Sequence, residues 1–365
     1  MKKKPRQEKE RRRSLKAAGS GLPAGTSKRS KSVTTKKDAA EKIDIFCHIL
    51  PSKTKEVLFK KATPCNYIDT DNSRPALFDL DRRFKAMDHF EGLRQVLTLG
   101  LPPLEYVLSP ADAADLARMA NDEMAELVSR YPDRFVAAVA GLPLNDIDAS
   151  LRETERAIRD LKFKGIQIFS SINGKPLDRD EFMPLYEMMA GFDLPLWIHP
   201  ARDKTVPDYA DEPHSKFTLF TAFGWPYETT LAMARLVFSG VLEKHPSLKF
   251  ITHHCGAMIP FFSKRVLLVR EGPEPGKGTP LTGPPLEYFK KFYGDTVLGG
   301  STPALMCGHA FLRERLPLSG RPRAWGCCAR RGHPLRGDDG HPGAREDGDL
   351  FEEREAGIAD VLTGG

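Results

Sequence analysis

Short apolar runs alternate with longer amphipathic stretches along most of the chain, beginning near Lys42. The apolar runs are rich in β-branched and aromatic residues, and they end abruptly in polar or small residues. This pattern is typical of buried strands that lead into loops. It predicts strands at Lys42–Ile49, Leu93–Gly100, Phe135–Leu144, Phe163–Ser170, Pro195–Pro200, Lys249–His254 and Phe292–Leu298.

Amphipathic helices are predicted between these runs, because apolar residues recur there at helical spacing. They are expected at Pro110–Arg130, Asp146–Leu161, Arg179–Gly191 and Tyr227–Lys244. Strict alternation of strands and helices implies a parallel sheet with crossover helices. Seven strands, with room for an eighth after His309, predict an α/β fold of the TIM type, a (β/α)8 barrel. In such barrels the carboxyl ends of the strands carry the chemistry.

The segment Arg202–Trp225 contains no predicted element. A loop of this length in a compact domain is usually an active-site lid or a binding insertion. Its aromatic residues could cover a substrate, with Trp225 as the candidate contact, or they could pack against a second subunit.

The net charge of +6 is unevenly distributed. Residues 1–40 hold 14 Lys and Arg against three acids, a net of +11, whereas the remainder has 41 against 46, a net of −5. Residues 1–40 have too few large apolar side chains to fold, so we expect a disordered basic extension or a start codon placed too early. A nucleic-acid or membrane tether is the alternative, but the acidic remainder argues against a nucleic-acid-binding domain.

The six cysteines form no CxxC pair, and no secretory signal precedes them. They are therefore expected to be free thiols in a reducing compartment, which predicts a cytoplasmic protein. Cys47 and Cys255 lie beside candidate site residues, where small buried fillers are commoner than metal ligands. No apolar run approaches the roughly 20 residues that span a bilayer.

Three of the predicted strands end in histidine: His48, His199, and the adjacent pair His253 and His254. A single histidine at a strand end is usually a hydrogen-bonded structural residue. Three in the same placement predict one shared site, to which only one of the adjacent pair can point. Imidazoles from separate strands suit a divalent metal, and a further histidine nearby can transfer a proton.

The same stretches carry a family resemblance. KIDIFCHILP, FKGIQIF, LPLWIHPA, FGWPYETTLAMARLVFSGVLEKHPSLKFITHHCG and FYGDTVLGGSTPAL follow one another along the chain. Their order resembles the amidohydrolase superfamily, in the branch of aminocarboxymuconate-semialdehyde decarboxylase and related decarboxylases, hydratases and hydrolases. The resemblance extends over residues 42–316, and it is specific for fold and branch but weak for substrate.

The resemblance implies a role for each histidine. His48 and His199 match metal ligands, whereas Phe46 stands where the family has the first histidine of an H-x-H pair and cannot ligate. His254 matches the catalytic histidine, because Cys255-Gly256 follow it, and His253 would then be a structural or second-shell residue on the other face. The implied cofactor is a divalent metal, with zinc expected ahead of manganese or magnesium.

The family's last ligand, an aspartate in an F-G-T/S-D-x-P turn, has no counterpart after Phe311–Leu316. From Pro317 the chain becomes rich in Gly, Arg and Pro. Ser319-Gly320-Arg321 can be encoded by bases that give Phe-Gly-Thr in another frame, so we infer a reading-frame slip. The domain organisation is then a basic extension (1–40), a barrel (41–316) and an atypical tail (317–365).

The resemblance favours a metal-dependent lyase that decarboxylates a small carboxylic acid. A hydrolase or hydratase on the same scaffold is one alternative, because this fold supports several chemistries. An inactive barrel that has lost metal ligands is another, favoured by Phe46 and the absent aspartate. The expected partners are a small carboxylate substrate and, on its apolar helix faces, a second copy of the chain. Neither a membrane nor a nucleic acid is expected.

Overall fold

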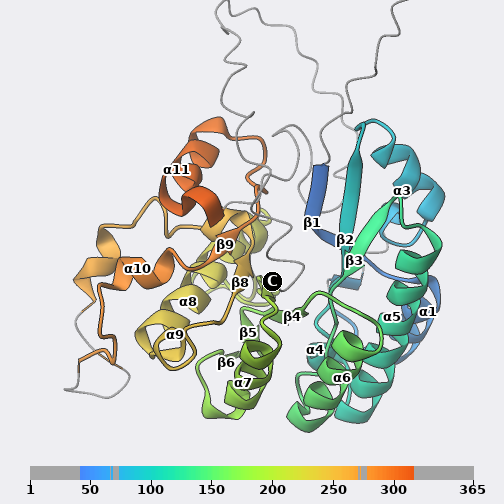
Figure 1. Cartoon of the computed structure of the whole chain (residues 1–365), viewed down its shortest axis with the longest axis horizontal. Helices are drawn as coiled ribbons and strands as arrows, with labels where there is room; N and C mark the ends of the chain where they lie inside the picture. Colours follow the sequence, from blue (N-terminus) through green and yellow to red (C-terminus); the bar gives the residue numbers. More distant parts are fainter. Residues whose placement is uncertain (1–41, 66, 69–73, 270–271, 273–277, 316–365) are drawn as a thin grey trace, which may run out of the picture. The chain divides into compact units, whose positions relative to one another are not determined.

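The structure is a computed structural model that describes residues 42–65, 67–68, 74–269, 272 and 278–315 (Figure 1). The basic extension and the atypical tail expected at 1–40 and 317–365 lie outside these residues. No helix in the described ranges is long and apolar enough to cross a membrane.

Seven parallel strands form one continuous series. The first sheet has the order β1-β2-β3 and the second has the order β4-β7-β8-β9. A parallel bridge between Ala140 and Ile166 joins the two, so β4 continues from the edge of β3. The strands are β1 (Lys42–Ile49), β2 (Leu93–Leu99), β3 (Phe135–Ala138), β4 (Ile166–Phe169), β7 (Leu196–His199), β8 (Phe250–Thr252) and β9 (Tyr293–Gly294). A short hairpin, β5 (Ser171–Ile172) and β6 (Lys175–Pro176), follows β4.

Helices connect the strands and pack on their outer side. Helix α5 contacts β3 and also α1 and α6 (Figure 1). The helices are α1 (Ser52–Lys61), α3 (Leu80–Met87), α4 (Leu104–Val107), α5 (Pro110–Arg130), α6 (Ile147–Arg159), α7 (Met183–Phe192), α8 (Trp225–Phe238), α9 (Val241–Lys244), α10 (Pro285–Phe289) and α11 (Thr302–Leu312). This alternation around a parallel series confirms the predicted barrel class.

Local sequence explains where the helices begin and end. Asp146 caps α6, its side chain accepting a hydrogen bond from the Ala149 backbone N–H. The single helix expected at 227–244 is instead two helices, because Gly240 adopts a left-handed conformation (φ 84°) between them. A Cβ at Gly240 would lie 2.7 Å from Pro280, so close packing also requires glycine there.

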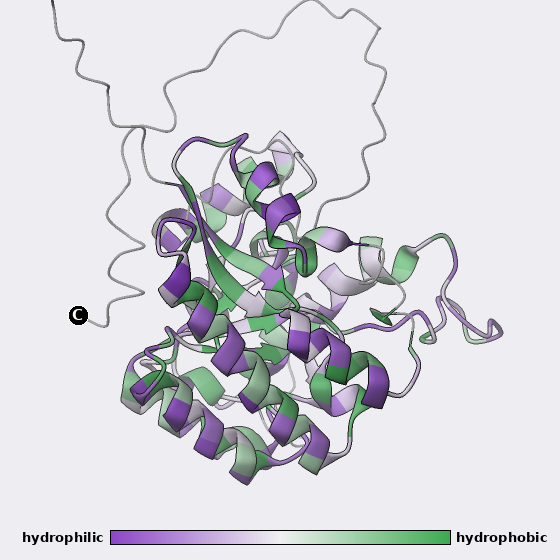
Figure 2. Ribbon diagram, turned by 90° about the vertical axis from the view of Figure 1, so that its right-hand side faces the viewer, coloured by the Kyte–Doolittle hydropathy of each residue, from purple (hydrophilic) through white to green (hydrophobic). Residues whose placement is uncertain are grey.

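The barrel interior is filled by alternate side chains from the strands. Trp197 on β7 reaches across it, and its indole N–H donates to the Ile45 carbonyl of β1 at 2.9 Å. Figure 2 shows that hydrophobic residues concentrate on the strands, while the helices carry hydrophilic residues on their outer faces. The interior cluster consists of Ile45, Phe46, Val96, Ala137, Val139, Trp197 and Ile251.

Candidate active site

Three histidines meet at the carboxyl ends of β1, β7 and β8. His48 and His199 are the penultimate and last residues of their strands, and His253 directly follows β8. All three are buried, and their ligand atoms lie within 4.8 Å of one another. The parallel strands bring them together because strand ends of the same polarity lie at one end of the barrel. The structure thus brings His48 and His199 together, as expected.

Each of these imidazoles uses its Nδ1 in a hydrogen bond. His48 Nδ1 lies 2.8 Å from Thr98 Oγ1, and His199 Nδ1 donates to its neighbour's carbonyl, the Pro200 oxygen, at 2.7 Å. His253 Nδ1 pairs with the Asp295 carboxylate. Within the described residues, Nε2 of His48 and Nε2 of His253 have no hydrogen-bond partner. Partnered Nδ1 atoms with free Nε2 atoms are typical of histidines that bind a metal.

The protonation states also suit a metal. Burial lowers the pKa of His48 and of His199 well below the ordinary value, and the neighbouring imidazoles lower each pKa further. Both rings are therefore neutral near pH 7, which is the form that binds a metal. The three histidines can hold a divalent metal.

Of the two adjacent histidines, His253, which was expected on the other face, is the one that joins the cluster, while the catalytic role expected of His254 stays a prediction. His253 belongs to the cluster, whereas His254 lies beyond it, with its ring centroid 5.3 Å from that of His253. The expectation assumed that strand alternation continues to His254, but β8 ends at Thr252, and residues from His254 to Ala257 all have positive φ. The alternation rule does not apply to such a turn.

His254 nevertheless remains close to the cluster. Its Nδ1 is buried and has no partner among the described residues. Burial, followed by the neighbouring His253, lowers the pKa of His254 to about 4, so this ring is also neutral near pH 7.

Phe46 fills the space beside the histidines. Its ring stacks on that of His253 with 3.7 Å between the centroids, and its centroid lies 5.5 Å from that of His48. The side chain is 1% exposed. An apolar ring therefore stands beside the three imidazoles, at the position where the resemblance implies another histidine.

Asp295 was missed by the sequence analysis, which placed it inside a predicted strand. The strand β9 ends at Gly294, and the Asp295 carboxylate is buried against His253. Burial raises the pKa of Asp295, but the interaction with His253 outweighs it, so the pKa lies below its ordinary value. The sequence signal that could have identified Asp295 is an acidic residue directly after an apolar run.

Aromatic side chains form a wall beside His199. The rings of Phe169 and Trp225 each have centroids 5.6 Å from the His199 ring. Trp225 is held by its indole N–H, which donates to the Arg202 carbonyl at 3.2 Å. Tyr67 is buried in the same apolar cluster. The structure thus places Trp225 next to the histidines, but its contact with a substrate stays a prediction.

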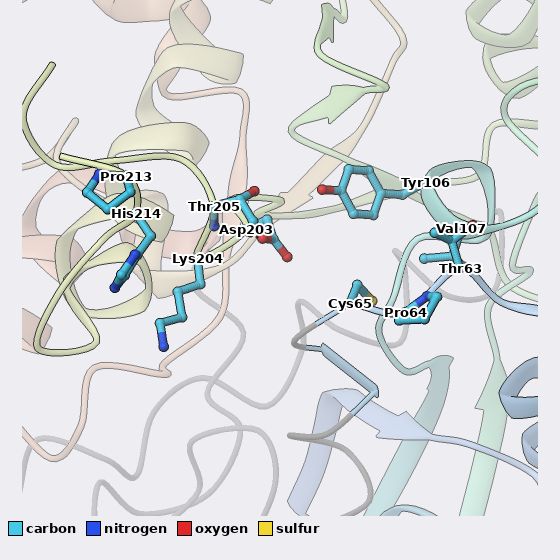
Figure 3. A pocket seen from close by; sticks show the side chains of 10 residues that line it. All are labelled: Thr63, Pro64, Cys65, Tyr106, Val107, Asp203, Lys204, Thr205, Pro213 and His214. Carbon is cyan, nitrogen blue, oxygen red and sulfur yellow. Dashed lines mark hydrogen bonds between the residues drawn. The ribbon is translucent and has the colours of Figure 1, made fainter. Parts of the chain in front are cut away.

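A cavity of about 640 Å³ lies between the segment after α1, helix α4 and the loop after β7 (Figure 3). Its volume is within the range of small-molecule sites, about 300–1,000 Å³. Cys65 lines it and also packs against the Tyr67 cluster, which connects the cavity with the aromatic wall. The lining residues are Thr63, Pro64, Cys65, Tyr106, Val107, Asp203, Lys204, Thr205, Pro213 and His214.

The buried cysteines lie outside the group of metal-ligating side chains found in the described residues. Cys47 donates from its thiol to the Asp44 carboxylate, with 2.8 Å between sulfur and oxygen. Cys255 packs so closely on α11 that a Cβ at Gly308 would lie 2.1 Å from its sulfur. Both positions are those of small packed side chains.

The parallel α/β barrel and the buried histidines at its strand ends place this protein among barrel proteins with a candidate metal site at the carboxyl ends of the strands. The amidohydrolase family model matches residues 43–274, which is more than half of the chain. The chain belongs to this family.

Curated relatives of the chain include decarboxylases. It is 33% identical over 193 residues to 2-amino-3-carboxymuconate-6-semialdehyde decarboxylase of Dictyostelium discoideum, covering 52% of this chain and 51% of the relative. It is 31% identical over 220 residues to gamma-resorcylate decarboxylase of Polaromonas sp. strain JS666, covering 58% and 67%. The chain thus spans about half to two thirds of the length of these relatives.

Solved structures agree with the fold. A 5-carboxyvanillate decarboxylase of Novosphingobium aromaticivorans, complexed with manganese and 4-hydroxy-3-methoxy-5-nitrobenzoic acid, is 25% identical, with a TM-score of 0.65 over 77% of this chain and 85% of that one. The dihydroxybenzoic acid decarboxylase of Polaromonas sp. JS666, with manganese and 2-nitroresorcinol, gives a TM-score of 0.59 at 25% identity over 76% and 84%.

Proposed function

We propose that the protein is a metal-dependent decarboxylase that removes CO₂ from a small aromatic carboxylate. The cluster of His48, His199 and His253 carries this proposal, because the unpartnered Nε2 atoms of His48 and His253 suit a divalent cation. The aromatic wall of Phe169 and Trp225 supports an aromatic substrate. The named activities of the relatives support the reaction type.

We propose zinc as the metal, since imidazole nitrogens are common zinc ligands. The manganese in the structures of the two relatives makes manganese the alternative. The bound metal would polarise a substrate oxygen. The three histidines would hold the metal. Phe169 and Trp225 would pack against the substrate ring and exclude water.

The reaction breaks the bond between the ring carbon and the carboxylate carbon. The electron pair stays on the ring carbon, which takes up a proton as CO₂ leaves. We assign to His254 the relay of this proton from water to the ring carbon: its buried Nδ1 has no partner among the described residues, so the neutral ring can take up one proton and pass one on.

Two observations favour a second candidate, an inactive barrel. Phe46 occupies a ligand position, and the last aspartate ligand implied by the resemblance is not found in the described residues. A hydrolase or hydratase would use the same histidines, so assays for CO₂ release and for hydrolysis should be run together.

The test uses the full chain, loaded separately with zinc and manganese and assayed for CO₂ release from 2,6-dihydroxybenzoate and 5-carboxyvanillate. We expect His48→Gln and His199→Gln to lose bound metal and turnover. The loss should exceed the factor of about 10–100 that is typical when a residue hydrogen-bonded to a metal ligand is replaced. His89→Gln is the control, because His89 is exposed and lies just after α3. This variant should retain both the bound metal and the turnover. A wild-type protein that holds no divalent ion after dialysis against either metal would refute the proposal.

A further inference from the structure

Asp295 is held by several hydrogen bonds at once. Its Oδ1 accepts the backbone N–H of Cys255 and of Val297, each at 3.1 Å, and its own N–H donates to the Thr252 carbonyl at 3.0 Å. Its Oδ2 pairs with His253 Nδ1. The residue is 1% exposed. The carboxylate therefore has a fixed position between the ends of β8 and β9.

An ionised carboxylate can only accept hydrogen bonds, so the proton between the two residues must be carried by His253 Nδ1. In a neutral ring, the lone pair is then on Nε2. That Nε2 is buried and has no partner among the described residues, and the ring belongs to the cluster with His48 and His199, so Nε2 is the nitrogen left to serve as a ligand. The pairing thus fixes both the orientation and the tautomer of the ring.

We propose that Asp295 is the positioning residue that selects the Nδ1–H tautomer of His253, which makes His253 the third metal ligand of a site in which Phe46 cannot ligate. This inference rests on the metal site of the proposed function. It gives His253 a role that the resemblance alone did not imply. It also explains why a carboxylate is buried beside the cluster without itself belonging to the ligand set.

A purely structural role for Asp295 is the competing explanation, because its Oδ1 ties down the left-handed turn after His253. Asp295→Asn separates the two roles. The asparagine Oδ1 can still accept both backbone N–H groups, whereas the amide NH₂ can only donate to His253 Nδ1. The His253 proton would then move to Nε2, and the nitrogen that faces the cluster would lose its lone pair.

The experiment measures the His253 tautomer and metal binding in the full chain. In the wild-type protein without metal, ¹⁵N NMR of labelled histidines should show His253 protonated on Nδ1, and His253→Gln assigns its signals. In Asp295→Asn the proton should lie on Nε2, and equilibrium dialysis with zinc should give an affinity about 10–100-fold lower. Asp178→Asn, which alters a mostly buried carboxylate paired with Arg235, should keep the wild-type affinity.

The outcomes separate the two proposals. If the wild type binds zinc and Asp295→Asn binds it equally well, the positioning role is wrong while the proposed function stands. If the wild type binds no metal, the proposed function fails first. Should Asp295→Asn not fold, the wild-type spectrum still decides, because an Nε2-protonated His253 in that spectrum overturns the positioning role.

Discussion

At the scale of single residues, Glu105 on α4 has an unusual environment. It is 5% exposed, and neither carboxyl oxygen has a hydrogen-bond partner among the described residues. Burial raises the pKa of Glu105 to about 8. The folded protein therefore keeps a proton that Glu105 in the unfolded chain, with a pKa of about 4.3, releases. The stabilising effect of that proton is complete below about pH 4 and is lost as the pH rises towards 8.

We therefore expect the Glu105 contribution to the free energy of unfolding to fall between about pH 5 and 8, by up to about 1.4 kcal/mol per pH unit. Glu105→Gln keeps the shape but removes the titration, so its stability should decline less over this range. Urea unfolding at several pH values measures the difference. The exposed Glu126→Gln should follow the wild type, and equal slopes for Glu105→Gln and the wild type would contradict a buried neutral carboxyl.

Residue-level prediction from the sequence succeeded where the strand pattern alone decides position. His48 and His199 lie together because they are at strand ends, which the apolar runs revealed. The orientation of His253 and His254 depends on where β8 stops, and the burial of Asp295 depends on packing between two strands distant in sequence. Neither follows from local pattern, so both needed the structure.

At the scale of elements, the apolar runs overestimate strand length. The run at 135–144 forms a strand only over Phe135–Ala138, followed by a single bridge at Ala140, and its buried residues continue beyond that bridge into the loop. The segment Arg202–Trp225 gave no periodic signal, and it is held instead by specific polar contacts. Ser215 donates to the Asp208 carboxylate and accepts from the Phe220 N–H. Such contacts do not recur at a regular spacing along the sequence, so a periodic pattern does not reveal them.

This segment exposes large aromatic side chains that none of the described residues covers. Phe217 is 89% exposed, Tyr209 is 72% exposed and Phe223 is 67% exposed. Phe217 also adopts a left-handed backbone conformation (φ 52°), which is unfavourable for an aromatic residue. Exposed apolar surface of this kind often marks an interface, and we expect a second copy of the chain to cover it.

The homodimer prediction can be tested with the double variant Phe217→Ser, Phe223→Ser. It should be monomeric in analytical ultracentrifugation at concentrations where the wild type is dimeric, because it loses two apolar side chains from the interface. Phe261→Ser is the matched control, since Phe261 is 76% exposed but lies after β8, outside the segment. A monomeric wild type, or a double variant that remains dimeric, would show that the surface has another role.

At the scale of the whole molecule, the strand series has two ends. In the described part of the chain, β1 pairs only with β2, and β9 pairs only with β8. The eighth strand, expected after His309, is not among these residues, where α11 extends to Leu312. Alternation of strand and helix was sufficient to predict seven strands in order, because each strand carries its own apolar run. The sequence after Leu316 has no such run, so pattern could not supply the closing strand.

That missing run leads to the last prediction, a reading-frame slip in the coding sequence. A barrel is closed when each strand has two neighbours, and unpaired edge strands invite aggregation. Resequencing codons 305–330 should reveal one inserted or missing base, and the corrected frame should encode a Phe-Gly-Thr turn followed by an aspartate. That aspartate would add an oxygen ligand to the three histidines, so the corrected protein should bind zinc more tightly than the printed chain. If the frame is confirmed instead, the slip is refuted, and the metal site must rely on the histidines that Phe46 and Asp295 adjoin.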